Sequence, residues 1–180
     1  MHVEREHDRI RLSPNPLEAQ IVEQVLRSVI KHYQLEPSQL DAKTAAVWYS
    51  TGGCKSSGMT EEETRDWVES LHSLKTSQLS RLEEWAGKLA ARQTAPVHLE
   101  LSFNEATSFI TILNDYRLFL AAQHNIGQRE MDLHSVRALQ ELPVPQQGAI
   151  CQIDFVGWLM DDLLRLVAPE ASRWRQDAEE

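Results

Sequence analysis

The sequence predicts a mainly α protein in which about five helices pack around a central buried helix, with a small antiparallel β element near the N-terminus. The first observation behind this prediction is the segment 102–127, which forms one helical pattern with apolar residues on most faces. Such a helix belongs at the centre of a domain. Several other stretches place apolar residues at three- and four-residue steps, whereas 3–12 and 96–101 alternate with period two. Because 180 residues can bury one full core, we predict a single domain, 1–180.

The N-terminal region is predicted to form a hairpin followed by a helix. Residues 9–12 alternate as a strand does, and they can pair with residues 3–6. Asn15 can then cap a helix, and Glu18 can bond back to that cap. Apolar residues recur on one face as far as Tyr33, so this first helix should bury one broad stripe.

The middle of the chain is predicted to hold a short helix at 45–49, a Gly/Ser-rich loop at 50–59 and a long amphipathic helix. The long helix begins at a capping box on Thr60 and extends to about residue 92. Its apolar residues follow a nearly seven-residue rhythm, and helix propensity falls near 75–77, where we expect a bend. The Trp/Leu stripe of this helix includes Trp67, Leu71 and Trp85.

The second half of the chain begins with the alternating segment 96–101, which we expect to pair with the strand that precedes the first helix. Ser102 and Glu105 form a capping box for the central helix, and Gly127 is expected to end it in a left-handed conformation. The remaining predicted elements are a helix at 132–142, a turn at 143–145, a last helix at 149–167 and a charged tail at 168–180.

Charge and composition argue against several classes of protein. The chain has 27 acidic and 18 basic side chains, a formal net charge of −9. Nucleic acids and anionic membranes both attract basic surfaces, so we expect neither as a partner. No apolar run approaches the roughly 20 residues that span a bilayer, and the N-terminus has no apolar signal core, so we predict a cytoplasmic protein. In that reducing compartment, Cys54 should be a free loop thiol and Cys151 a core thiol.

Common catalytic and cofactor motifs are not matched. The glycines at 52–58 resemble a phosphate-binding loop, but their spacing to Lys55 is wrong and the helix starts only at Thr60, so we interpret the segment as a flexible connection. The seven histidines lack the spacing of paired metal ligands, and no nucleophile elbow is present. We therefore predict no catalytic residues, no metal and no cofactor.

The polar middle of the central helix is the strongest candidate site. Asn114, Asp115 and Arg117 stand among apolar neighbours, where unsatisfied polar groups are costly. Asp161 and Asp162 similarly interrupt the last helix. We expect Arg117 to form an ion pair with Asp162 or Asp161 while Asn114 satisfies nearby backbone, because a buried arginine needs a counter-charge. The alternative is that Arg117 anchors an anionic ligand, since its planar fork suits carboxylate or phosphate.

Residues 113–118, Leu-Asn-Asp-Tyr-Arg-Leu, resemble the Leu-Asn-Asp-x-Arg-Leu signature of a bacterial family known as domain of unknown function 2017. Residues 10–12, followed by Glu18 and an apolar helix, and residues 158–159 are similar to its two ends. The chain departs from the family in having Ala-Ala-Gln-His at 121–124, where members usually have Gly and Arg. No activity is established for the family, so the resemblance implies no substrate or cofactor.

The sequence is consistent with two classes of function. The first is a non-catalytic interaction or adaptor domain, which could form a homodimer or bind a protein through the stripe of Trp67, Leu71 and Trp85. The second is a small-ligand-binding protein or an enzyme, with an anion site around Arg117 and the last helix. A cavity that opens onto Arg117 would favour the second class, whereas an exposed stripe would favour the first.

Overall fold

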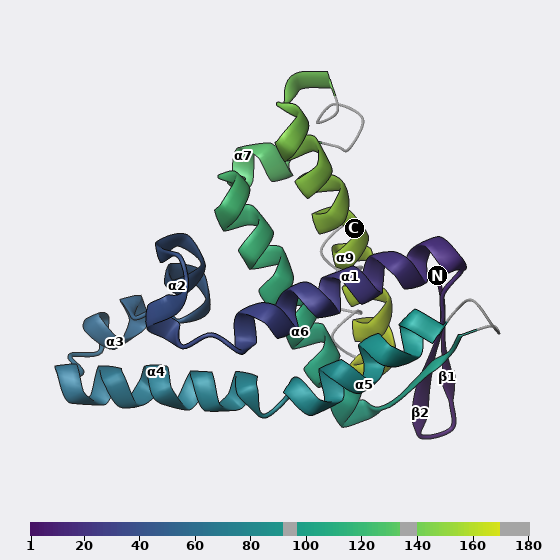
Figure 1. Ribbon diagram of the computed structural model, residues 1–180, viewed down its shortest axis with the longest axis horizontal. Helices are drawn as coiled ribbons and strands as arrows, with labels where there is room; N and C mark the ends of the chain where they lie inside the picture. Colours follow the sequence, from purple (N-terminus) through teal and green to yellow (C-terminus); the bar gives the residue numbers. More distant parts are fainter. Residues whose placement is uncertain (92–96, 134–139, 170–180) are drawn as a thin grey trace.

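The computed structural model describes residues 1–91, 97–133 and 140–169. It is mainly α, as predicted, and its helices surround α6 (Phe103–His124), with a small sheet at the end of the molecule where the chain begins (Figure 1). Helix α6 packs most extensively against α9 (Val144–Val167), and also against α2 (Ala42–Trp48) and α1 (Pro16–Tyr33). The central position predicted for the segment is therefore confirmed.

The sheet has three antiparallel strands in the order β1 (His2–Glu6), β2 (Arg9–Ser13) and β3 (Leu99–Ser102). Strands β1 and β2 form the predicted hairpin, and Ile10 on β2 pairs with Leu101 on β3, so the predicted partnership across the sequence is confirmed. Strand β3 is shorter than the predicted 96–101, and residue 96 lies outside the described residues. One face of the sheet closes the core, because Ile10 and Leu101 are both fully buried.

Helix α1 begins as the sequence predicts. Asn15 accepts hydrogen bonds from two backbone amides of the first turn, and the Glu18 side chain completes the capping box. The helix buries one stripe that ends at Tyr33, although Leu17 at its start is exposed. This stripe packs on α5 (Leu79–Ala90) and on α6.

The segment between α1 and the next long helix contains more helix than predicted. A 3₁₀ turn, η1 (Pro37–Gln39), leads to α2, and the glycine-rich segment then forms a short helix, α3 (Gly52–Ser56). The predicted Gly/Ser-rich loop at 50–59 therefore contains a short helix. Cys54 is buried within this helix and Cys151 is exposed on α9, so the two thiols have the opposite environments to those predicted.

The long helix predicted from residue 60 is divided in two. Helix α4 (Glu61–Thr76) ends where the propensity falls, and two residues separate it from α5, so the predicted bend is a complete break at Ser77 and Gln78. The halves differ in burial: α5 buries four side chains, including Trp85, whereas none on α4 is buried. Helix α4 lies along the edge of the molecule, beneath α2 and α3 in Figure 1.

Helix α6 starts at the predicted capping box, since Ser102 and Glu105 satisfy each other's backbone amides. It ends at Asn125, whose φ of 50° is left-handed, rather than at Gly127. A short α7 (Gln128–Met131) follows, and the predicted helix at 132–142 lies largely outside the described residues. The predicted turn at 143–145 is instead the start of α9, because proline fits the first turn of a helix. No helix among the described residues combines the length and the apolar character needed to cross a membrane.

Candidate functional site

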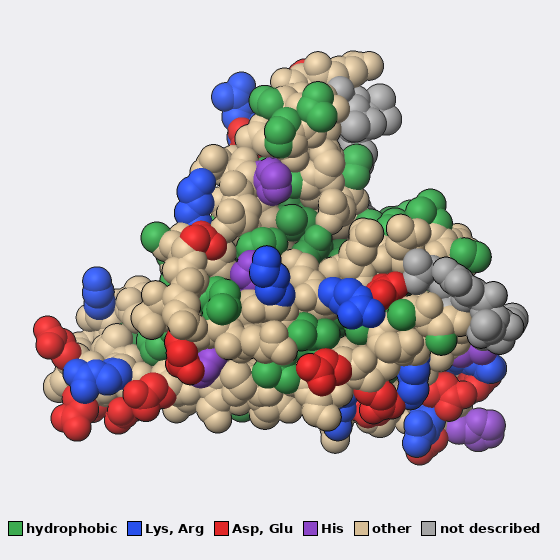
Figure 2. Space-filling model, viewed as in Figure 1, with side chains coloured by type: hydrophobic (Ala, Val, Ile, Leu, Met, Phe, Trp, Pro, Cys, Tyr) green, Lys and Arg blue, Asp and Glu red, His purple; other side chains and the backbone are tan. Residues whose placement is uncertain are grey.

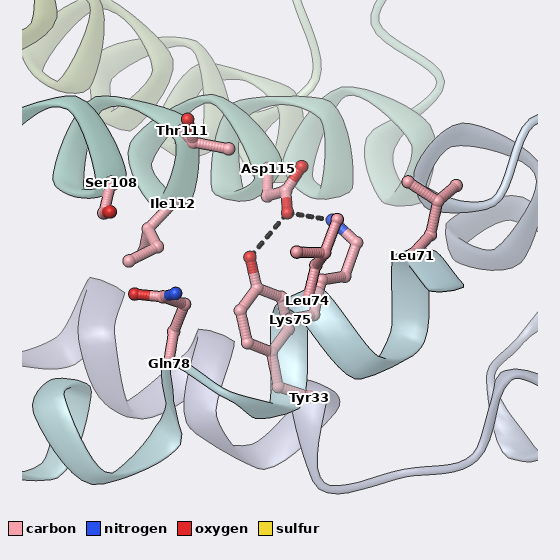
Figure 3. A pocket seen from close by; sticks show the side chains of 9 residues that line it. All are labelled: Tyr33, Leu71, Leu74, Lys75, Gln78, Ser108, Thr111, Ile112 and Asp115. Atoms are coloured by element: carbon pink, nitrogen blue, oxygen red, sulfur yellow. Dashed lines mark hydrogen bonds and ion pairs between the residues drawn. The ribbon is translucent and has the colours of Figure 1, made fainter. Parts of the chain in front are cut away.

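The side chain of Asp115 is the charged group most deeply enclosed in the described part of the core. It lies on the side of α6 that faces α1 and α4, and only 7% of the residue is exposed. The Tyr33 hydroxyl donates a 2.5 Å hydrogen bond to Asp115 Oδ2, and Lys75 Nζ forms an ion pair with the same oxygen (Figure 3). Three helices therefore meet at one carboxylate oxygen.

Aromatic rings surround the Lys75 ammonium. Its Nζ is 5.3 Å from the ring centroids of both Tyr33 and Trp48, and 6.0 Å from that of Tyr49. Cations are attracted to the faces of such rings, and the attraction increases where water is excluded. Only 12% of the Lys75 side chain is exposed. The Trp48 ring is held in place by a 2.8 Å hydrogen bond from its Nε1 to the backbone oxygen of Asp115.

The electrostatics of this cluster keep the phenols neutral. Burial, and then the negative charge of Asp115, raise the pKa of Tyr33 far above its usual value. Burial, followed by the charges of Asp115 and Glu36, raises the pKa of Tyr49 to about 12. Near neutral pH, Tyr33 is therefore a hydrogen-bond donor, and the charges of Lys75 and Asp115 offset each other. This arrangement is that of an internal ion pair.

A cavity of about 250 Å³ opens beside this cluster between α4 and α6, and we call it the α4–α6 cavity. Figure 3 shows Leu71, Leu74 and Lys75 on the α4 side of it and Asp115 on the α6 side. Its lining residues are Tyr33, Leu71, Leu74, Lys75, Gln78, Ser108, Thr111, Ile112 and Asp115. The lining is mostly apolar, and its charged groups are the paired Lys75 and Asp115.

Comparison with family models gives one match, which covers residues 1–167 and is described as a domain of unknown function, DUF2017. The chain belongs to the DUF2017 family. This confirms the resemblance drawn from residues 113–118. No curated protein and no solved structure matches the chain.

In this DUF2017 protein, the three polar residues of the central helix are not gathered into one site. Asp115 is buried in the cluster described above, whereas Asn114 is exposed. Arg117 is half-buried and lies against α9, where its Nη1 is 3.9 Å from the sulfur of Met160. Its Cζ also lies close to the backbone of Gly157, at 3.7 Å from the position that a Cβ would occupy there.

The predicted ion pair between Arg117 and Asp161 or Asp162 is not formed among the described residues of the DUF2017 protein. Both aspartates are half-buried on α9, yet Arg117 Nε is buried without a hydrogen-bond partner in the described structure. The prediction was wrong because the buried ion pair joins α6 to α4 and not to α9. The carboxylate that needs a cation is Asp115, and its cation comes from α4.

The predicted stripe of Trp67, Leu71 and Trp85 is also divided. Trp67 is 45% exposed and Leu71 is half-buried on α4, whereas Trp85 is buried on α5, where its ring meets Phe109 edge-on at 5.2 Å. The break at Ser77 and Gln78 separates the two tryptophans. Only the α4 half of the stripe is available at the surface.

Tyr33, Trp48 and Lys75 were not predicted as partners of Asp115. One signal was available for Lys75, which follows Leu71 by four positions and so lies on the apolar stripe of its helix. A lysine in such a stripe needs a partner if it is enclosed. Among the described residues, no group of three His, Cys, Asp or Glu side chains could hold a metal ion.

Proposed function

We propose that this DUF2017 protein is a non-catalytic protein-interaction domain that binds a partner through the exposed face of α4. The observation that supports the proposal is that α4 is a 16-residue helix with no buried side chain, although it carries large apolar residues. Trp67 is 45% exposed and Leu74 is 64% exposed. These two residues are seven positions apart and so share one face of the helix. Large exposed apolar side chains on one helix face are typical of binding surfaces.

The way α4 is attached supports the same proposal. It packs lightly, chiefly against α1, and its strongest fixed point is the ion pair of Lys75 with Asp115 near its C-terminal end. Leu71 and Leu74 also form one side of the α4–α6 cavity. A partner that covers Trp67 and Leu74 would therefore lie over the mouth of that cavity.

An affinity experiment with matched variants tests the proposal. The variant Trp67→Gln/Leu74→Gln removes the apolar face of α4, and Trp158→Gln removes an even more exposed tryptophan, 76% exposed, from α9. We expect proteins retained by the wild type from the native cell extract to be lost with the α4 variant and kept with Trp158→Gln. Equal retention by all three proteins would contradict a role for α4.

A homodimer is one form that this interaction can take. Light scattering after size exclusion would then give about twice the 20.6 kDa of one chain for the wild type. The Trp67→Gln/Leu74→Gln variant would elute as a monomer. A monomeric wild type at high concentration would leave a different protein as the partner.

The compartment is part of the proposal. We propose that the protein acts in the cytoplasm and does not bind nucleic acid. Its net charge of −9 disfavours phosphate contacts, and both of its cysteines are free thiols, as is usual in a reducing compartment. Fractionation of native cells, followed by detection of the chain, tests the location.

A second candidate function is supported by the unpaired Nε of Arg117. The half-buried Arg117 forms no ion pair with the described residues and could bind an anionic ligand, although the half-buried Asp161 and Asp162 on α9 would disfavour an anion there. Thermal unfolding with inorganic phosphate and with acetate tests this candidate. A stabilisation that disappears in Arg117→Met but persists in the exposed-site variant Arg129→Met would support it, and no stabilisation would remove it.

A further inference from the structure

The groups that surround the Lys75 ammonium are held in place by elements other than α4. Tyr33 on α1 donates a hydrogen bond to Asp115 on α6 at 2.5 Å, and Trp48 on α2 donates from Nε1 to the backbone oxygen of Asp115 at 2.8 Å. The rings of Tyr33 and Trp48 meet edge-on, with their centroids 5.4 Å apart. These contacts join α1, α2 and α6 to one another, so they position the carboxylate and the two rings without the help of Lys75.

The position that these groups enclose suits an ammonium ion. Lys75 Nζ lies over the rings of Tyr33 and Trp48, 5.3 Å from each centroid, and 6.0 Å from the centroid of Tyr49. It also pairs with the carboxylate of Asp115 (Figure 3). Aromatic faces attract cations, and a carboxylate adds a full counter-charge. We call Tyr33, Trp48, Tyr49 and Asp115 the ammonium cage.

Lys75 enters the cage from a weakly held helix. Helix α4 has no buried side chain, whereas α5 buries four. Within the described part of the chain, the side-chain hydrogen bonds, ion pairs and ring contacts of α4 with the rest of the fold come from His72 and Lys75, one turn apart. A turn at Gly58, with a φ of +70°, and the break at 77–78 flank the helix. Segments with few buried contacts can open without global unfolding.

Opening of α4 would leave negative charge at the cage. Lys75 is the partner of Asp115, and His72 Nε2 is 3.6 Å from the carboxylate of Glu36, so both nitrogen groups would leave together. Asp115 and Glu36 belong to the part of the fold that stays. A carboxylate that loses its cation beside apolar groups costs free energy, so a second ammonium group is the ligand that restores the lost interactions.

We propose that the ammonium cage is a binding site for a primary alkylammonium group, with Lys75 as its internal occupant and α4 as the lid that the ligand displaces. One ammonium replaces another, so Asp115 stays paired and the rings stay in contact with a cation while Lys75 moves into water. The α4–α6 cavity reaches Asp115 past apolar side chains and gives the alkyl chain room. This site is separate from the exposed face of α4, so either proposal can fail without the other.

Amide hydrogen exchange of the wild type tests the proposal without any substitution. We expect α4 amides to exchange through local opening, and therefore earlier than those of α1 and α6. At about 0.1 M, n-butylammonium chloride should accelerate exchange in α4 several-fold relative to the same concentration of sodium chloride, because it stabilises the open form. Exchange in α6 should not change. The control is n-butanol, which has the alkyl chain without the charge and should not accelerate exchange in α4.

The exchange data can overturn the proposal in three ways. Equal exchange of α4 in n-butylammonium and sodium chloride would show that no external cation enters the cage. Equal protection of α4 and α6 would show that α4 does not open by itself. An equal effect of n-butanol would show that the ammonium group is not recognised.

A second probe distinguishes the two sources of a primary alkylammonium, a free amine and the lysine side chain of a protein. Nα-acetyl-lysine N-methylamide carries the same group on a peptide backbone. Acceleration of α4 exchange by both probes supports a lysine of a partner protein. Acceleration by n-butylammonium alone supports a free amine.

A variant without the internal occupant should respond with the opposite sign. In Lys75→Ala the cage is vacant in the folded state, so n-butylammonium should raise the temperature of unfolding by several degrees. It should not raise that of the wild type or of the control Lys88→Ala, because Lys88 pairs with Glu84 at the surface of α5. If Lys75→Ala does not fold alone, we expect n-butylammonium, and not n-butanol, to restore its circular dichroism. No effect on Lys75→Ala, or an equal effect on all three proteins, would contradict the cage.

Discussion

Tyr33 on α1 and Asp115 on α6, which are 82 residues apart in the sequence, are joined by a 2.5 Å hydrogen bond inside the core. The same Asp115 oxygen takes the charge of Lys75 from α4. This cluster links the first long helix, the lightly packed helix and the central helix. Its geometry leads to direct tests of stability.

Replacement of Tyr33 by phenylalanine removes the hydroxyl and retains the ring. We expect a loss of about 1.5–3 kcal/mol in the free energy of unfolding, the usual range for a hydrogen bond to a charged group. Urea unfolding measures it. Tyr116→Phe is the control, because the Tyr116 hydroxyl donates to the exposed Gln152, and its loss should be smaller. Equal losses would mean that the Tyr33 hydrogen bond contributes no more to stability than the Tyr116 hydrogen bond does.

Lys75 and Asp115 should be coupled in a double-mutant cycle. Lys75→Met leaves an enclosed carboxylate and Asp115→Asn leaves an enclosed ammonium, so each should cost about 2–4 kcal/mol. The double variant removes both charges and should cost less than the sum by more than about 1 kcal/mol. Urea unfolding of the four proteins gives the coupling, and additive losses would contradict the ion pair.

Alkaline titration should show that the tyrosines ionise late. The chain has three tyrosines, Tyr33, Tyr49 and Tyr116, and burial raises the pKa of each. Because the folded state holds these protons more tightly than the unfolded chain does, stability is complete below about pH 10 and falls as the pH rises further. Tyrosinate absorbance in the ultraviolet should therefore stay low through pH 10 and then increase together with unfolding. Ionisation near pH 10 in a protein that keeps its circular dichroism would contradict this burial.

Two glycines should respond in opposite ways to alanine. Gly157 lies inside α9, and an added Cβ would meet Arg117 Cζ at 3.7 Å, an ordinary contact distance. Gly157→Ala should therefore stabilise the protein by about 0.5–1 kcal/mol through helix propensity. Gly58 has a φ of +70°, so Gly58→Ala should destabilise by about 1 kcal/mol. A destabilising Gly157→Ala, measured by urea unfolding, would show that Arg117 needs the open space above the α9 backbone.

The fold was largely predictable because its signals are local. The capping box of Ser102 and Glu105, the stripe of α1 and the alternation around Ile10 each depend on residues close together in the sequence. The division between α4 and α5 was visible as a fall in helix propensity near 75–77. That fall did not indicate that the two helices differ in burial. Only the packing of α5 on α1 decides that Trp85 is buried while Trp67 is exposed.

The candidate site was predictable only in part, because the partners of Asp115 lie far from it in the sequence. The sequence singled out Asp115 as a polar residue in an apolar helix, but it could not show which side of α6 would face a cation. Arg117 and the aspartates of α9 were assigned to each other because they are the charges on two apolar helices. The actual counter-ion, Lys75, comes from a helix with an ordinary amphipathic pattern.

Ser102 is both the last residue of β3 and the N-cap of α6, so no spacer separates the sheet from the central helix. One residue inserted at this junction would rotate α6 by about 100° relative to the strands. That rotation would carry Asp115 from the side of Lys75 towards a neighbouring element. The chain length from Leu101 to Asp115 is thus constrained by angle as well as by distance, and insertions there should be far less tolerated than between α3 and α4.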